Sequence, residues 1–304
     1  MKLSIVSTLY NSPETVPELI DRCVQVGREF AGDDFEIVLI DDACPKYSAD
    51  IAEEHGRGIS QLRIVRLARN FGQHHALMEG FRQSKGEFVF ALDGDLEEEP
   101  EWLMRFHREL QETGSDVVYG FQRPHRRGIV DAIQGYVGYG VIKGLTGLSF
   151  KPNLVTARLM RRDYVDALCS FTERSIWLAG LWDQAGYTQR AIQVEKSRLT
   201  VTNYDFRSKL SQLLDAVLTF SNKPLRLVFG FGLLGSAGAI VAVGIAVVRG
   251  LSGDVLDGWA SMLASIWILG GALLFSTSIL AYYVGVVFIE VKSRPSVIVR
   301  KSRN

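Results

Sequence analysis

Two long runs without charged residues, near the C-terminus, constrain the fold of this chain more than any other feature. No Asp, Glu, Lys or Arg occurs within residues 227–248, and none occurs within residues 258–289. Each run exceeds the roughly 20 apolar residues that an α-helix needs to cross a bilayer. Residues 249–258 between them are too few to form a domain. The pattern therefore predicts two transmembrane helices within residues 227–289. A pair of buried helices in a soluble protein is the alternative interpretation.

Basic residues flank both ends of this predicted hairpin. They are Arg207, Lys209, Lys223 and Arg226 before the first run, and Lys292, Arg294, Arg300, Lys301 and Arg303 after the second. The connecting loop contains one basic residue, Arg249, and two acidic residues, Asp254 and Asp257. Because cytoplasmic loops carry an excess of Lys and Arg, we expect both termini on the cytoplasmic side. Residues 290–304 then form a basic cytoplasmic tail.

Residues 206–226, just before the first run, carry an apolar stripe at helical spacing. The stripe consists of Leu210, Leu213, Leu214, Val217 and Leu218. Such a stripe beside basic residues is typical of an amphipathic helix at the membrane surface. A stripe that faces the core of the preceding domain is the other interpretation.

The N-terminal part, residues 1–205, alternates strand-like and helix-like segments. Strand-like runs at 3–10, 35–43, 62–67 and 87–95 are separated by helix-like runs at 12–30, 48–56 and 72–84. Apolar strands with few polar breaks, separated by helices, predict a sheet that is mostly parallel and covered on both faces. We therefore expect an α/β domain on the cytoplasmic side of the membrane.

Polar residues follow each of the four strand-like runs. They are Tyr10 and Asn11, Asp41 and Asp42, Arg69 and Asn70, and Asp93 and Asp95. Ligands of open α/β sheets bind at the carboxyl ends of the strands, so these residues predict a ligand cleft. No G-x-G-x-x-G follows the first run, which disfavours a dinucleotide.

The stretch "FVFALDGDLEEEP" places two carboxylates at the end of the fourth strand-like run. Asp93 and Asp95 should repel each other unless a cation lies between them, and Mg²⁺ prefers one or two carboxylates together with phosphate oxygens. Gly94 allows a close approach of the backbone to a ligand. The sequence therefore predicts a divalent-cation site at Asp93 and Asp95, whereas Glu98 and Glu99 are interpreted as a solvated turn.

Several segments together resemble family 2 glycosyltransferases with a GT-A fold, and most closely those of the polyprenyl-phosphate type. This group includes dolichol-phosphate-mannose synthases and bacterial bactoprenol glucosyltransferases. The segments that carry the resemblance are "SIVSTLYNSPETVPELI", "EIVLIDDA", "RLARNFGQHHALMEGF", "ALDGDLEEEPEWL", "ARLMRRDYVDAL" and "KPLRLVFGFGLL". They extend over almost the whole chain, including the predicted hairpin.

The resemblance implies a hexosyltransferase that inverts the anomeric carbon and uses Mg²⁺ or Mn²⁺. A nucleotide diphosphate sugar would bind at Leu9, Tyr10, Asn11, Asp41, Asp42, Arg69, Asp93 and Gly94. Asp95, with Asp93, would hold the metal ion, and Asp95, Arg158 and Arg198 would be the catalytic residues. Weaker candidates for the phosphate of the lipid are Arg126, Arg127 and Lys143.

Two segments depart from the family pattern. The chain has "DDACPKYS" where relatives have "DDGSTDGS", so the choice among UDP, GDP and dTDP stays open. It also has "NLVTARLM", without the acidic residue that often precedes this motif in relatives. A polyprenyl phosphate is already anionic near pH 7 and needs cationic positioning more than a base. The missing carboxylate therefore favours a lipid phosphate as acceptor over a sugar hydroxyl.

The expected partners are a nucleotide sugar, a polyprenyl phosphate and the bacterial inner membrane, in which the chain would be a multi-pass protein. A homo-oligomer is possible for relatives with glycine-rich hairpins. Lys and Arg number 34 and balance 34 Asp and Glu, so the charge gives no reason to expect nucleic acid. Two other functions stay open: a membrane glycosyltransferase that elongates a glycan, and a catalytically inert protein that binds nucleotide sugars.

Overall fold

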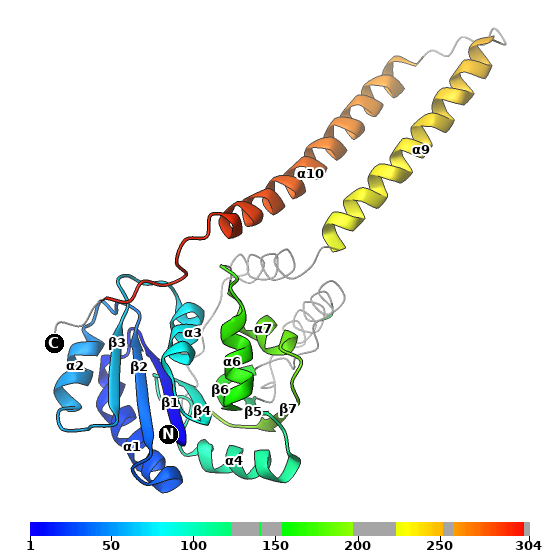
Figure 1. Ribbon diagram of the computed structural model, residues 1–304. Coiled ribbons are helices and arrows are strands. Elements are labelled where there is room, and N and C mark those ends of the chain that lie inside the picture. The colour runs from blue at the N-terminus through cyan, green and yellow to red at the C-terminus, as the bar shows by residue number, and fades with distance from the viewer. Residues whose placement is uncertain (123–139, 141–153, 175, 197–222, 252–257, 301–304) are drawn as a thin grey trace. The chain divides into compact units, whose positions relative to one another are not determined.

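The computed structural model describes residues 1–304 except 123–139, 141–153, 175, 197–222, 252–257 and 301–304 (Figure 1). Contacts divide the chain into two compact units. The first comprises Met1–Tyr136, Leu148–Tyr204 and Arg294–Asn304, and the second comprises Val137–Gly147 and Asp205–Ser293. The first unit contains the sheet, and the second contains two long helices.

Strands and helices alternate along the first unit in the predicted order. The elements up to the fourth strand are β1 (Leu3–Leu9), η1 (Pro13–Thr15), α1 (Val16–Ala31), β2 (Phe35–Asp41), α2 (Ser48–His55), β3 (Leu62–Arg66), α3 (Gln73–Gln83) and β4 (Phe88–Asp93). They are followed by α4 (Trp102–Thr113), β5 (Val117–Phe121), β6 (Leu154–Arg161), α6 (Arg162–Ser170), α7 (Leu178–Gln184) and β7 (Gln189–Gln193).

The strands form one seven-stranded sheet in the order β3-β2-β1-β4-β6-β5-β7. β1 pairs in parallel with β2 and β4, and β2 pairs in parallel with β3. β6 is antiparallel to both β4 and β5, while β7 is parallel to β5. The prediction of an α/β fold with a mostly parallel sheet is confirmed. Because β6 runs in the opposite direction, its first residues lie at the same edge as the last residues of β4.

Helices pack closely on both faces of the sheet. On one face α4 contributes Phe106, whose ring meets Phe90 of β4 edge to face at 6.1 Å between centroids. On the other face α3 lies so close to β1 that a Cβ atom at Gly80 would stand 2.4 Å from Cγ1 of Val6. Both faces of β1 and β4 are therefore covered, which explains their continuous apolar sequences.

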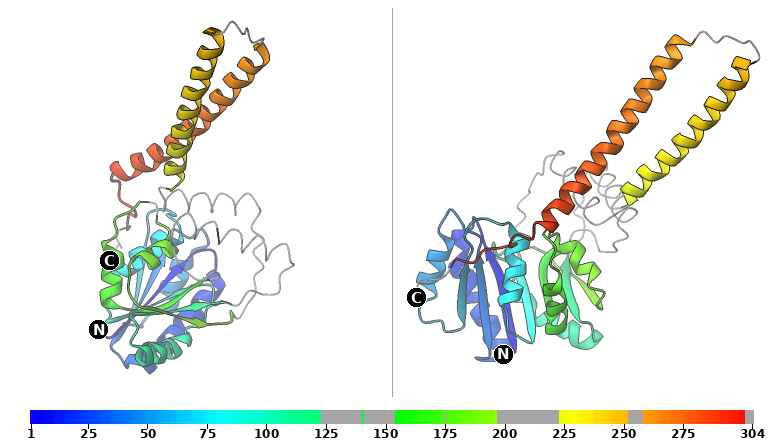
Figure 2. Two further views of the ribbon diagram at one scale, coloured as in Figure 1. Left: turned by 90° about the vertical axis from the view of Figure 1, so that its right-hand side faces the viewer. Right: turned by 45° about the horizontal axis from the view of Figure 1, so that its top comes forward.

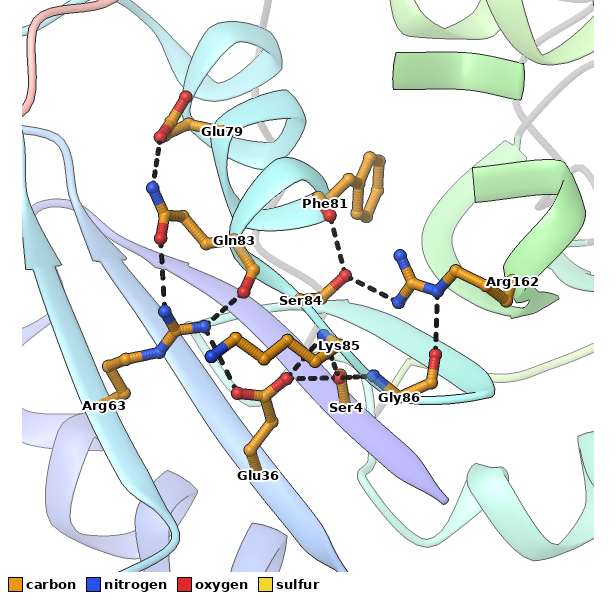
Figure 3. A network of polar contacts seen from close by, with 10 residues as sticks. All are labelled: Ser4, Glu36, Arg63, Glu79, Phe81, Gln83, Ser84, Lys85, Gly86 and Arg162. Atoms are coloured by element: carbon orange, nitrogen blue, oxygen red, sulfur yellow. Dashed lines mark hydrogen bonds and ion pairs between the residues drawn. The ribbon is translucent and has the colours of Figure 1, made fainter. Parts of the chain in front are cut away.

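A buried polar network joins the elements at the edge opposite to the carboxyl ends of β1 and β2 (Figure 3). The Glu36 carboxylate accepts hydrogen bonds from the Ser4 hydroxyl and the Lys85 backbone N–H, both at 2.7 Å, and from the Arg63 guanidinium at 3.2 Å. Arg162 of α6 donates to the carbonyl oxygen of Gly86 at 2.9 Å. This network connects β1, β2, β3 and α6 around the start of β4.

The second unit contains two long helices, α9 (Lys223–Leu251) and α10 (Trp259–Val291), which are coloured yellow and orange to red in Figure 2. Within the described residues, one helical segment, Ser265–Val291, is long and apolar enough to cross a membrane, and its mean hydropathy is 2.0. The apolar part of α9, Leu225–Val241, is shorter. The described part of the chain thus contains one candidate span where the sequence predicts two. Apart from Lys223 to Arg226, the predicted amphipathic helix at 206–226 lies outside the described residues.

The end of the chain returns to the sheet of the first unit. Val299 forms an antiparallel bridge with Leu67, just after β3. The backbone N–H of Ala68 donates to the carbonyl oxygen of Ile298 at 2.8 Å, and the N–H of Arg300 donates to that of Arg66 at 2.8 Å. The region predicted as a basic tail therefore contains a short segment that pairs with the sheet edge, next to Arg69.

Candidate functional site

The ends of β1, β2 and β4 converge at the carboxyl edge of the sheet. Each of the loops that follow contains a non-glycine residue with a left-handed backbone: Asn11 at φ 61°, Ala43 at φ 52° and Leu96 at φ 60°. Such backbone conformations are uncommon for non-glycine residues and cluster at functional sites. The edge where sequence patterns predict a ligand cleft is therefore also where strained backbone gathers.

Asp93 is the last residue of β4, Asp95 lies in the turn that follows, and the two carboxylates have different hydrogen-bond partners. The side-chain amide of Gln73 donates to Oδ1 of Asp93 at 2.5 Å, and the backbone N–H of Glu97 donates to Oδ1 of Asp95 at 3.0 Å. Burial raises the pKa of Asp93 to about 6, and the nearby Asp95 charge adds to the shift. A carboxylate with a raised pKa, such as that of Asp93, is stabilised in its ionised form by a nearby cation.

Gly94, between the two aspartates, lies in close contact with the end of β1. A Cβ atom at this position would stand 2.4 Å from the backbone oxygen of Thr8. The carbonyl oxygen of Gly94 also accepts a hydrogen bond from the Thr15 hydroxyl at 2.8 Å. The glycine thus lets the turn after β4 lie directly against the end of β1.

Glu98 is fully buried, with an exposure of 0%. Its carboxylate accepts hydrogen bonds from the backbone N–H of Asp93 at 3.2 Å and of Thr156 at 2.9 Å, so it joins the end of β4 to the start of β6. Burial raises the pKa of Glu98 to about 8, and the Asp93 charge contributes. The interpretation of Glu98 as part of a solvated turn is wrong, because the antiparallel β6 brings backbone donors to this position.

Lys196, shortly after β7, lies among the carboxylates at the end of β4. Its Nζ is 3.3 Å from Oε2 of Glu97, 3.6 Å from Oε1 of Glu98 and 4.0 Å from Oδ2 of Asp93. Burial by itself would lower the pKa of Lys196. The negative charges of Glu98 and Asp93 have the larger combined effect, so the pKa of Lys196 is raised. We refer to Asp93, Asp95, Glu97 and Glu98 as the acidic rim. Sequence patterns did not identify Lys196, because it lies far from the rim along the chain.

Asp41 and Asp42 at the end of β2 are buried and bonded to backbone. Oδ1 of Asp41 accepts a hydrogen bond from the N–H of Cys44 at 3.0 Å. The two oxygens of Asp42 accept from the N–H groups of Phe71 at 2.7 Å and Gly72 at 2.8 Å. Burial raises the pKa of both carboxyl groups, against the effect of these hydrogen bonds. Asp42 thereby fixes the loop between β3 and α3.

The other predicted donor-site residues lie around this loop and the end of β1. Arg69 is exposed, and its guanidinium carbon lies 4.1 Å from the centroid of the Phe71 ring. Tyr10 is 45% exposed, whereas Leu9 is buried. The backbone N–H of Asn11 donates to Sγ of Cys44 at 3.3 Å, which links the loops after β1 and β2. The structure therefore brings these residues, the two aspartates of β2 and the acidic rim to one edge of the sheet.

Arg158 lies apart from this edge. It pairs with Ala91 in the middle of the sheet, is 1% exposed, and its guanidinium carbon is 2.9 Å from the centroid of the Trp182 ring. Burial lowers the pKa of Arg158 to about 10, and within the described residues Nη1 has no hydrogen-bond partner. Arg158, Tyr119 and Trp182 line a cavity of about 250 Å³. The other predicted phosphate-binding residues, Arg126, Arg127, Lys143 and Arg198, lie outside the described residues.

The acidic rim suits a cation that is completed by substrate rather than by protein alone. Among the described residues, no group of three Asp, Glu, His or Cys side chains is arranged to hold a metal ion. Mg²⁺ and similar ions commonly take one or two carboxylates and fill their remaining positions with phosphate and water. Asp95 has one oxygen bonded to backbone and Asp93 is close by, so this pair fits such a role.

Comparison with known proteins identifies the family of this chain. The model of the family "Glycosyl transferase family 2" matches residues 4–168. The chain belongs to this family, and it is a glycosyltransferase.

Two relatives and one solved structure resemble the chain along nearly all of its length. A protein of Mycobacterium tuberculosis named "Putative glycosyltransferases" is 37% identical, over 99% of this chain and 88% of the relative. An "Undecaprenyl-phosphate 4-deoxy-4-formamido-L-arabinose transferase" of Pseudomonas fluorescens is 30% identical, over 98% and 89%. A mannosyltransferase from Pyrobaculum calidifontis, solved with GDP-Man and Mn²⁺, has a TM-score of 0.51 at 16% identity, over 97% and 88%. This last similarity supports the GT-A-like fold.

Proposed function

We propose that this chain transfers a single sugar from a nucleotide diphosphate sugar to a polyprenyl phosphate in the membrane, with undecaprenyl phosphate as the bacterial acceptor. The observation that carries the proposal is the acidic rim at the carboxyl edge of the sheet, in a family 2 glycosyltransferase that also has a long apolar helix. A relative named for transfer to undecaprenyl phosphate matches 98% of the chain and supports this acceptor. The product would serve the synthesis or modification of cell-envelope glycans.

In this proposal Asp95, assisted by Asp93, holds Mg²⁺ or Mn²⁺ against the diphosphate of the donor. The ion would supply neutralisation of the charge that develops on the leaving diphosphate. The mannosyltransferase solved with Mn²⁺ supports a divalent ion for this fold. The two oxygens of Asp95 differ in their contacts, since Oδ1 accepts the N–H of Glu97 and so orients the carboxylate.

The nucleotide would lie against the loops after β1, β2 and β3. The guanidinium of Arg69 packs over the Phe71 ring and offers a positive charge to the nucleotide. Tyr10, just after β1, offers an exposed aromatic ring. Asp42 acts indirectly in this proposal, because both of its oxygens are bonded to the backbone of the loop that carries Arg69. Asp41 similarly holds the loop after β2 through Cys44.

The acceptor phosphate would meet basic side chains near the membrane. We propose Arg198 for this contact, with Arg126, Arg127 and Lys143 as further candidates. Arg158 is buried against Trp182, so we assign it a positioning role under the β5–β6 part of the sheet. A lipid phosphate is ionised near neutral pH, so its oxygen attacks without prior removal of a proton, and inversion at the anomeric carbon follows from attack opposite the diphosphate.

The proposed organisation is a GT-A domain at 1–205, an amphipathic helix at 206–226, two membrane helices at 227–289 and a basic tail at 290–304. The segment Ser265–Val291 supports one span, and the uncharged part of α9 is proposed as the other. Basic residues at both ends of the pair support a cytoplasmic location for both termini and the catalytic domain under the positive-inside rule. We therefore propose a multi-pass protein of the bacterial inner membrane, which is able to form homo-oligomers.

The proposal is tested with the full-length protein in detergent, undecaprenyl phosphate, and a panel of radiolabelled UDP-, GDP- and dTDP-sugars with Mn²⁺. We expect one donor to label a product that partitions into the organic phase and forms only when the lipid phosphate is present. A labelled product that stays in water, or equal labelling with undecaprenol in place of its phosphate, would contradict the proposed acceptor.

A further inference from the structure

One ammonium group and three carboxylates form a compact cluster at the end of β4. The Nζ atom of Lys196 lies within 4.0 Å of carboxylate oxygens of Glu97, Glu98 and Asp93. The lysine comes from the segment just after β7, whereas the carboxylates come from the end of β4 and the turn that follows it. The cluster therefore depends on the tertiary fold rather than on neighbours in sequence.

This cluster differs from the surface ion pairs of the same domain in its burial. The side chain of Lys196 is 18% exposed, and those of Glu97 and Glu98 are 14% and 0% exposed. By contrast, Arg190 of β7 pairs with Glu109 at 2.9 Å while 60% exposed. Carboxylates removed from water need a compensating charge, and Lys196 is the cation at this position.

The ammonium also stands beside the proposed divalent-cation site. Oδ2 of Asp93 faces Lys196, and Asp95 lies two residues further along the same turn. Two cations at such short range repel each other strongly in a partly buried site. The ammonium of Lys196, in its present position, would therefore repel a divalent ion bound to Asp93 and Asp95. The binding of such an ion would in turn displace the ammonium.

We propose that Lys196 is the resident counter-ion of the acidic rim, a positioning residue that holds Asp93, Glu97 and Glu98 in place and gives way when a divalent cation binds. The proposal rests on the proposed function for the location of the cation site. Lys196 then has two effects. It stabilises the domain in the absence of metal, and it weakens metal binding because its ammonium competes for the same carboxylates.

The first experiment compares Lys196→Gln with Lys196→Arg and with Arg190→Gln, the matched control on β7. Each full-length variant is titrated with Mn²⁺ alone in detergent, and free Mn²⁺ is followed by electron paramagnetic resonance. We expect Lys196→Gln to bind Mn²⁺ at least about fivefold more tightly than the wild type, because a competing positive charge is removed. Lys196→Arg and Arg190→Gln should resemble the wild type.

The thermal unfolding of the same proteins gives a second result. Lys196→Gln should unfold at a lower temperature than the wild type without metal, and Mn²⁺ should restore more of its stability than it adds to Arg190→Gln. If Lys196→Gln binds Mn²⁺ no more tightly than the wild type, or if Mn²⁺ fails to restore its stability, the proposal is wrong.

An experiment on the unmutated protein covers the case in which Lys196→Gln does not fold. Lysines are acylated briefly with and without Mn²⁺, and the extent of modification at each is measured by mass spectrometry. We expect Mn²⁺ to increase modification of Lys196 at least about threefold, because the ion displaces the ammonium from the carboxylates, while exposed Lys85 stays constant. Unchanged modification of Lys196 would overturn the proposal.

These readouts separate the inference from the proposed function. Tighter Mn²⁺ binding by Lys196→Gln without any sugar transfer by the wild type would support the counter-ion and contradict the transferase proposal. Transfer to undecaprenyl phosphate with no change in Mn²⁺ binding would support the transferase and contradict the counter-ion.

Discussion

The carboxylate of Asp42 accepts hydrogen bonds from the backbone N–H groups of both Phe71 and Gly72, at 2.7 and 2.8 Å. This relationship joins the end of β2 to the loop after β3, on which Arg69 is exposed. Gly72 has a φ of 92°, a conformation that suits glycine and turns its N–H toward the aspartate. The geometry of the proposed nucleotide-binding loop therefore depends on a residue that faces inward.

Asp42→Asn should weaken this loop, because an amide group has one acceptor oxygen where the carboxylate has two. We expect a loss of about 1–3 kcal/mol in the free energy of unfolding, since a buried donor is left unpaired. The KM for the nucleotide sugar should rise more than kcat falls. Thermal unfolding and steady-state kinetics measure the two effects. Asp33→Asn, at an exposed position, is the control and should change neither. An unchanged melting temperature for Asp42→Asn would contradict the anchoring role.

Glu36 lies at the opposite edge of the sheet and should affect stability without affecting catalysis. Its buried carboxylate accepts hydrogen bonds from Ser4, Lys85 and Arg63, so Glu36→Ala removes the shared acceptor of three hydrogen bonds in a buried network (Figure 3). We expect a loss of about 2–4 kcal/mol in the free energy of unfolding. Turnover per folded molecule should stay within about twofold of the wild type.

Glu53→Ala is the matched control for Glu36→Ala. Glu53 pairs with Arg66 at an exposed position, so its removal should cost less than about 1 kcal/mol. Chemical denaturation of both variants measures the difference. Equal losses for the two variants would contradict the importance of the buried network.

The buried ring of His74 should make the domain less stable in mildly acidic solution. Nδ1 of His74 lies 3.2 Å from the carbonyl oxygen of Ile176, and burial lowers the pKa of the ring below its usual 6.5. Below pH 6.5 the His74 ring becomes protonated in the unfolded chain but stays neutral in the folded chain. The free energy of unfolding therefore decreases as the pH is lowered from 6.5 to the lower pKa of the folded state. Above pH 6.5 the ring is neutral in both states and contributes no pH dependence.

His74→Asn removes this proton while keeping an amide that is able to donate to Ile176. The difference in melting temperature between the wild type and His74→Asn should therefore change between pH 7.5 and pH 5.5, in the direction that favours the variant at acidic pH. Groups distant from His74 that titrate in this range affect both proteins alike. A difference that stays constant with pH would show that His74 is not the group responsible.

The strand-like runs of residues 3–95 could be predicted from the sequence because their signals are local. The run predicted at 35–43 corresponds to β2 at Phe35–Asp41, and the helix predicted at 72–84 corresponds to α3 at Gln73–Gln83. Apolar strands and polar residues at their ends are visible without knowledge of the partner strands. This sufficed to place Asp42, Asp93 and Asp95 at one edge.

Long-range pairing explains what the sequence could not predict. The antiparallel direction of β6 buries Glu98, which the sequence suggests as part of a solvated turn, and places Arg158 inside the sheet. Lys196 reaches the acidic rim from more than a hundred residues beyond Asp93. The bridge from Val299 to Leu67 joins residues more than two hundred positions apart in the sequence. Each of these features depends on which strand lies next to which.

The most direct test of the central claim is the rate of sugar transfer to undecaprenyl phosphate by the wild type and Asp95→Asn, with the donor found in the panel. The account predicts that the wild type requires Mg²⁺ or Mn²⁺ and stops in EDTA, and that Asp95→Asn is at least about 100-fold slower at saturating metal while it melts at a similar temperature. Transfer by Asp95→Asn within twofold of the wild type, or transfer by the wild type that EDTA leaves unchanged, would contradict the account.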